Sequence, residues 1–191
     1  YEYEVTVPST YTKDVAILGI TFNGDAPYEG YFFDASAYKT SDATKAELII
    51  NGNFAEGYLN SWVWKYTNFG ANGNLTEKNF DPDEHGKEVT VKVVDFDASL
   101  MAPAPTPPAP THKMVKITSN HKGPFGNQID VTAGETYTFK FGVSDSLDFN
   151  VVLHDKDARH TDLNATVTPI SSDDSADGYT YYEYEVTVPS T

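Results

Sequence analysis

Three large aromatic residues alternate along one short stretch of the sequence: Trp62, Trp64 and Tyr66. Successive side chains of a β-strand point to opposite faces, so these three would share one face. A row of flat aromatic rings stacks on the apolar faces of sugar rings, while nearby polar groups bind the hydroxyls. The same face could instead belong to a hydrophobic core. Exposure of Trp64 and Tyr66 in a groove would favour sugar binding, and their burial would favour a structural role.

Patterns that carry catalysis are missing from the sequence. There is no GxSxG, HExxH, P-loop or dinucleotide-binding pattern, so we identify no nucleophile, general base or cofactor cradle and expect no enzyme activity. Residues 81–88 (DPDEHGKE) begin like a calcium loop, but Lys92 stands where the ligating Glu should be, which predicts an acidic surface turn. Residues 154–160 (HDKDARH) include metal-ligating types, but a loop gives them no common face, and solvated charge is the better interpretation.

The composition limits the classes of partner. The 191 residues carry a formal net charge of −15, which argues against nucleic acid or an anionic membrane as a partner because both would repel the chain. The absence of cysteine excludes disulfides and thiolate metal sites, and it is compatible with a bacterial surface protein. No run approaches the roughly 18 apolar residues that span a bilayer, so we expect no membrane insertion.

One segment occurs twice. Residues 1–10 read YEYEVTVPST, and residues 182–191 read the same at every position, an offset of 182 − 1 = 181 residues. Self-similarity at a fixed period is typical of tandem arrays, so we interpret the chain as one period of a repetitive protein. The alternative is that the two ends reflect only where a repetitive sequence was cut.

The duplicated segment has the pattern of a strand. In the first copy Tyr1, Tyr3, Val5 and Val7 fall on one face, and in the second copy Tyr182, Tyr184, Val186 and Val188 do the same. Pro8 then ends the first copy, since proline cannot donate to a β-ladder. If the fold has one place for this strand, the two copies compete for it. The losing copy is then free to pair with another molecule or with the next repeat, as in donor-strand complementation.

The remaining sequence predicts an all-β fold. Short strand-like runs bounded by turn residues recur along the chain without a convincing helical period, which indicates a sandwich or jelly roll. We expect residues 1–38 to supply closing strands of this or a neighbouring module, residues 39–45 to form a connector, and residues 46–191 to form the main body. The proline-rich residues 101–112 are interpreted as an excursion within that body rather than a linker.

Three stretches carry a family resemblance: residues 48–62 (LIINGNFAEGYLNSW), 125–141 (FGNQIDVTAGETYTFKF) and 30–38 (GYFFDASAY). They resemble the opening, middle and closing segments of carbohydrate-binding modules of the family 4, 9 and 22 type, which are non-catalytic antiparallel jelly-roll sandwiches. The closing segment here precedes the opening one. The resemblance therefore implies a circularly permuted jelly roll with a terminal strand available for exchange.

The resemblance also implies site residues. Modules of this kind often hold a structural calcium ion, for which Asp34 and Glu56 are the candidates in this sequence. Gln128 is similar to a glutamine of the family's sugar-binding cleft, and Trp62 stands at the family's structural tryptophan, which favours a core position for it. The sequence departs from the family at the second Asp of the closing segment, which is Ala35, and this weakens the case for calcium.

Two functions follow from these observations. The first is a non-catalytic repeat unit of an extracellular surface or filament protein, whose partners are copies of itself joined head to tail by complementation with the duplicated segment. The alternative is a polysaccharide-binding module attached to a secreted enzyme or adhesin, with Trp64, Tyr66 and Gln128 as the sugar contacts. Both interpretations predict an extracellular or cell-surface location and no nucleic-acid partner.

Overall fold

The strands of the chain form two antiparallel layers. The computed structural model describes residues 2–6, 12–23, 28–64, 67–68, 75–80, 89–95, 113–119, 123–144, 148–158, 161–174 and 179–187. Its strands are β1 (Glu2–Thr6), β2 (Val15–Phe22), β3 (Tyr28–Lys39), β4 (Trp62–Trp64), β5 (Thr67–Asn68), β6 (Glu77–Phe80), β7 (Val89–Asp95), β8 (Lys113–Ser119), β9 (Pro124–Asp130), β10 (Thr136–Ser144), β11 (Phe149–Asp155), β12 (Val167–Asp174) and β13 (Tyr179–Thr187).

The first layer has the strand order β11-β2-β9-β4-β5. β2 lies between β11 and β9 and pairs with both in antiparallel fashion along nearly its whole length. Its sequence VAILGITF is almost continuously apolar, and residues 16–20 are all buried. A short unbroken apolar run of this kind is typical of a strand that is covered on both faces.

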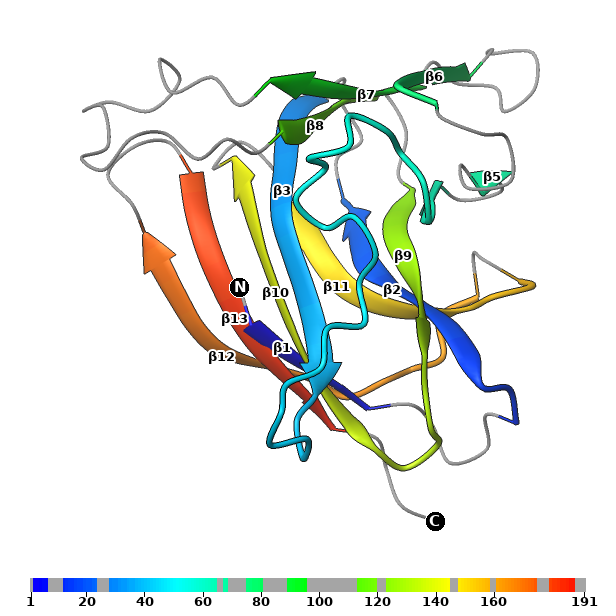
Figure 1. Cartoon of the computed structure of the whole chain (residues 1–191), viewed down its shortest axis with the longest axis vertical. Coiled ribbons are helices and arrows are strands. Elements are labelled where there is room, and N and C mark those ends of the chain that lie inside the picture. Colours follow the sequence, from blue (N-terminus) through cyan, green and yellow to red (C-terminus); the bar gives the residue numbers. More distant parts are fainter. Residues whose placement is uncertain are drawn as a thin grey trace.

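The second layer begins with the order β3-β8-β7-β6 and continues from β3 to β10 (Figure 1). The Thr40 N–H donates to the Thr136 carbonyl oxygen at 2.9 Å, and the Tyr31 N–H donates to Ser144 Oγ at 3.0 Å. These contacts join opposite ends of β3 and β10, so the two strands run antiparallel side by side. β10 then pairs with β13, and β13 pairs with β12.

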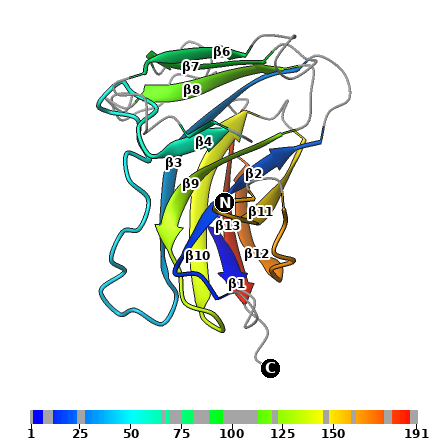
Figure 2. The same cartoon turned by 90° about the vertical axis from the view of Figure 1, so that its right-hand side faces the viewer.

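The two layers pack face to face as a β-sandwich, as the view in Figure 2 makes clear. The predicted all-β sandwich is therefore confirmed. β2 and β3 lie in the same two layers as the strands from residues 113–155, so the segment that precedes residue 39 contributes to one shared sandwich in this chain. Jelly-roll connectivity, the circular permutation and strand exchange stay predictions.

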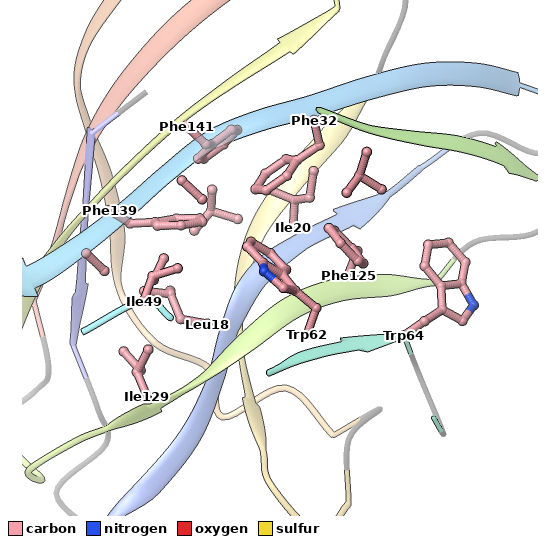
Figure 3. Close-up of a cluster of buried hydrophobic side chains, with 14 of the residues drawn as sticks. Leu18, Ile20, Phe32, Ile49, Trp62, Trp64, Phe125, Ile129, Phe139 and Phe141 are labelled. Atoms are coloured by element: carbon pink, nitrogen blue, oxygen red, sulfur yellow. The ribbon is translucent and has the colours of Figure 1, made fainter. Parts of the chain in front are cut away.

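Aromatic side chains fill the centre of the sandwich (Figure 3). The Trp62 ring stacks on Phe125 with the ring centroids 4.7 Å apart, and it also contacts Phe32 at 5.3 Å and Phe54 at 4.9 Å. All four rings are fully buried. Aromatic pairs in such geometries each add about 0.5–1.5 kcal/mol beyond their buried area, so this cluster anchors the core.

The close approach of β2 and β9 explains two glycines. Gly19 lies opposite Gly126 in the ladder. A Cβ at position 19 would lie 2.2 Å from the Phe125 carbonyl oxygen, and a Cβ at position 126 would lie 2.6 Å from the Leu18 carbonyl oxygen. Real Cβ atoms do not come this close to backbone oxygen, so only glycine is compatible with this pairing.

Candidate functional site

The outer edge of β10 is the place where the duplicated segment meets the sandwich. A β-strand has two edges for ladder hydrogen bonds, and β3 lies along one edge of β10 through the contacts at Thr40 and Tyr31. One edge of β10 is therefore left for a further neighbour. Both copies of the duplicated segment are found on β10.

The two copies pair with β10 in the same register. In β1, Glu2 lies opposite Lys140, and in β13 the equivalent Glu183 lies opposite Lys140 as well, since 2 + 181 = 183. The correspondence continues at the next three positions of β10, Phe139, Thr138 and Tyr137, where β1 supplies 3, 4 and 5 and β13 supplies 184, 185 and 186. Both copies run antiparallel to β10, so they also run in the same direction.

The two copies also share a neighbour on their other side. Tyr3 of β1 lies opposite Pro169 of β12, and the equivalent Tyr184 of β13 lies opposite the same Pro169. β10 and β12 therefore each pair with both copies, and β1 and β13 pair with each other in parallel. Figures 1 and 2 both show β1 beside β13 and β10.

These pairings define one position rather than two. Strands β1, β10, β13 and β12 form a closed barrel, in which β1 and β13 also pair with each other. The interior of an eight-stranded barrel is just wide enough for its own side chains, so a barrel of four strands is narrower still. Since one edge of β10 is available and both copies are placed on it in the same register, we interpret these pairings as competition of the two copies for one place. We call this place the shared position: the edge of β10 at residues 136–140 that faces Pro169 of β12.

The described side chains of β1 are buried where β1 lies between β10 and the second copy. The alternation of the sequence predicts Val5 facing inward and Glu4 and Thr6 facing outward. Val5 and Thr6 are both fully buried, and Glu4 is only 5% exposed. β13 lies alongside β1 in the structure, so this burial describes the two copies together. Of the other predicted assembly residues, Tyr1, Val7 and Val188 lie outside the described residues, and Tyr3, Tyr182, Tyr184 and Val186 are placed by their backbone.

The aromatic row does not form a surface at Trp64. The Trp64 side chain is 3% exposed, and its ring stacks on Phe22 with the centroids 5.9 Å apart. A ring enclosed in this way has no face to offer to a sugar, so the expectation that Trp64 binds sugar by stacking is not supported. Trp62 is fully buried, as predicted for a core residue, and its Nε1 donates to the Asn51 carbonyl oxygen at 3.2 Å.

Of the other two predicted sugar contacts, Gln128 lies among the described residues. Tyr66 lies outside the described residues. Gln128 is half-buried in β9, where it lies opposite Ile17. Trp64 lies opposite Phe125, three residues earlier in β9, and side chains an odd number of residues apart point to opposite faces. Trp64 and Gln128 therefore do not share a face, and sugar binding through Tyr66 or Gln128 stays a prediction.

A hollow of about 380 Å³ lies where the loop after β3 returns to that strand. Its polar lining comes from Asp34, Glu47, Asn51 and Asn53. Asp34 and Asn51 have left-handed backbone conformations, with φ values of 49° and 56°. Gly52 is required here because a Cβ would lie 1.8 Å from the Ala35 carbonyl oxygen, the same tight approach that lets the Ala35 N–H donate to the Gly52 carbonyl oxygen at 3.1 Å.

The calcium pair expected from the resemblance is only half present at this hollow. Asp34 lines it, whereas Glu56 is exposed and does not line it. Glu47 does line it, but its carboxylate accepts hydrogen bonds from the N–H groups of Ala37 and Ile49, both at 2.8 Å, and from Ser36 Oγ at 2.6 Å. Glu47 therefore organises the loop. No cluster of three or more metal-ligating side chains is found within the described part of the chain, and calcium binding stays a prediction.

The charged residues at the end of β11 are held by an ion pair with Lys13. Lys13 Nζ lies 2.6 Å from Asp155 Oδ1 and 2.8 Å from Asp157 Oδ2. Hydrogen bonds to Asp155 and then Asp157 raise the pKa of Lys13. Burial alone would raise the pKa of Asp155, but hydrogen bonds from Lys13 and from the N–H groups of Ala158 and Asp157 outweigh it and lower that pKa. Lys13 therefore offsets part of the negative charge of these two carboxylates and holds them in an ion-pair network.

Comparison with known proteins identifies no family for this chain. No protein-family model, curated protein or solved structure matches the chain. Within the part of the chain that the structure describes, no helix has the length and apolar character needed to cross a bilayer. The function is therefore argued from the shared position itself.

The sequence pointed to the duplicated segment, but not to the partners that make its position. Residues 136–140 of β10 and Pro169 of β12 were not among the candidate site residues. The available signal was limited to residues 125–141, which include most of β10 and resemble the middle segment of the family. Which strand accepts the duplicated segment, and in which register, depends on packing between segments far apart in the chain.

Proposed function

We propose that the chain is a non-catalytic repeat unit of an extracellular surface or filament protein that joins copies of itself head to tail. The joint is β-strand complementation: the duplicated segment of one unit fills the shared position of another. Ladder hydrogen bonds to β10 supply the affinity, and the alternating side chains of the segment supply the specificity. Calcium and sugar ligands are not needed for this joint.

The observation that supports the proposal most strongly is the common register of the two copies. Both place a glutamate opposite Lys140, and both place a tyrosine between Phe139 of β10 and Pro169 of β12. A chain with two identical strands and one position for them always has one strand left over. Exposed strand groups without a ladder are a template for pairing with another chain.

Exchange between chains costs little free energy, because it replaces one ladder with an equal one. The incoming and outgoing strands have the same sequence, so their hydrogen bonds and side-chain contacts to β10 are equivalent. Exchange of an identical element is a low-cost route to association. Because the two copies lie at opposite ends of the sequence, the contact is heterologous, and such contacts produce open chains unless the rotation closes a ring.

The polysaccharide-binding alternative has no structural observation in its favour. It depended on exposed aromatic rings at positions 64 and 66, and Trp64 is buried. Tyr66, the other ring on which it depended, lies outside the described part of the chain. A sandwich fold of this kind hosts both binding and structural functions, so the fold alone does not favour sugar binding.

The mass in solution tests the proposal. We expect light scattering to give wild-type masses that rise above the monomer mass as the concentration increases. The variant Val5→Pro removes the ladder N–H of β1 and leaves one competent copy for one position, so it should stay monomeric at the same concentrations.

The matched control is Val5→Ala, which keeps the N–H and should associate like the wild type. Association of Val5→Pro to the wild-type extent would contradict the proposal. A wild type that remains monomeric throughout the concentration range would contradict it as well.

A further inference from the structure

The two copies differ in how far their ladders extend along β10. Among the described residues, β1 covers β10 from Thr136 to Lys140. β13 covers the same region from Tyr137 to Lys140, and it continues with residues 179–182 opposite Phe141 to Ser144. β13 is therefore paired at the shared position and also at four positions of β10 beyond it.

The ladder between β13 and β12 is interrupted between Glu183 and Tyr184, one residue inside the shared position. Residues 180–183 of β13 pair in an unbroken run with residues 171–174 of β12, and the register then shifts between Pro169 and Ser171. The residue left out of the pairing is Ile170, whose side chain is 47% exposed. A bulge of this kind disrupts the ladder locally and bends the strand.

Pro169 weakens the ladder on the same side of the bulge. It is the partner of Tyr184, and proline has no N–H to donate. The section of β13 from Tyr184 onward therefore has a poorer hold on β12 than the section before it. That weakly held section is also the one for which β1 has an identical replacement in the same register.

We infer that the exchange is partial: residues 179–183 stay paired as an anchor, and β13 peels from Tyr184 onward to admit the duplicated strand of a second copy of this chain. This inference rests on the proposed function and specifies its mechanism. The released end of β13 has the same sequence as the strand that displaced it. Each unit that accepts a strand therefore offers a new one, and the association propagates from unit to unit.

Engineered disulfides test whether the exchange is partial. The chain contains no cysteine, so two introduced residues form a defined pair. The exchanging section is locked by Thr138→Cys with Glu185→Cys, which lie opposite each other, and the anchor is locked by Val143→Cys with Thr180→Cys, which also lie opposite each other. Opposed residues of antiparallel strands have Cα separations of about 4.5–5.5 Å, which suits a disulfide.

We expect the oxidised lock at 138 and 185 to abolish concentration-dependent association, because no position can then admit a second strand. The oxidised lock at 143 and 180 should leave association at the wild-type level, because the anchor stays paired in either state. In reductant both variants should associate like the wild type, and this shows that the substitutions themselves are tolerated.

The outcomes separate this inference from the proposed function. Equal loss of association with both locks would overturn partial exchange and leave strand complementation standing, since it would mean that the whole of β13 must leave. Association that persists with the lock at 138 and 185 would overturn both. A wild type that stays monomeric would likewise overturn both, because there would be no exchange for either lock to block.

Discussion

The double variant Val5→Pro with Val186→Pro should lose far more stability than the two single variants together predict. Each single variant leaves one intact copy with the same register on β10, so the shared position stays filled and the free energy of unfolding should change little. The double variant has no strand that can complete the ladder. Residues in one network show coupling energies of about 0.5–3 kcal/mol, and we expect a value near 2–3 kcal/mol here.

Urea unfolding of the wild type, the two single variants and the double variant measures this coupling directly. Val5→Ala combined with Val186→Ala is the matched control, because it shortens both side chains and keeps both backbone N–H groups. Its loss should be smaller than that of the double proline variant. Single-variant losses that simply add to give the double-variant loss would contradict a shared position, since they would mean that each copy has a place of its own.

The second large effect is expected at Trp62, where Trp62→Ala should destabilise the sandwich by about 3–5 kcal/mol. The ring is fully buried against Phe32, Phe54 and Phe125, so its removal leaves a cavity in the centre of the core. The substitution also removes the Nε1 hydrogen bond to the Asn51 carbonyl oxygen, which fixes the loop to the core.

Trp62→Phe separates these two contributions. It keeps an aromatic ring and loses the hydrogen bond, so it should cost less than Trp62→Ala. Chemical denaturation measures both variants, provided that the alanine variant remains folded enough to give a baseline; otherwise the thermal midpoint of the phenylalanine variant replaces it. A loss below about 1 kcal/mol for Trp62→Ala would show that Trp62 does not anchor the core.

Local patterns predicted the strands better than the faces that the strands bury. Residues 14–22 (DVAILGITF) are mostly apolar, and β2 is a buried central strand. The alternation of Trp62 and Trp64 predicted a shared face, but Trp62, Val63 and Trp64 are all buried. The sequence could not reveal that Phe22 of a distant strand covers Trp64, because that contact depends on how β2 and β4 pack around β9.

The loop around the hollow was predicted less well, for a geometric reason. Glu56 was chosen because its position resembles that of a family ligand, whereas Glu47 was overlooked. Residues 34, 51 and 54 have left-handed conformations in this loop, and Glu47 lines the hollow together with Asp34. Asp and Asn adopt left-handed conformations more often than most residues, but residue type does not say at which positions they do, so the spacing along the sequence did not reveal which carboxylate lies there.

The duplicated segment shows both the strength and the limit of the sequence. Ten identical residues predicted competition between two copies without any structural information. The common partners Phe139 and Pro169 could not be predicted, because strand pairing between distant segments is set by the tertiary fold. The position of the bulge next to Pro169 is likewise visible only in the register.

Hydrogen–deuterium exchange of the two copies in one sample is the most direct test of the shared position. Peptic fragments that contain residues 2–6 and residues 183–187 are distinguished by their flanking sequences. We predict partial protection of both fragments in the wild type, increased protection of 183–187 in Val5→Pro, and increased protection of 2–6 in Val186→Pro. Full and simultaneous protection of both fragments in the wild-type monomer, unchanged in either variant, would contradict the shared position.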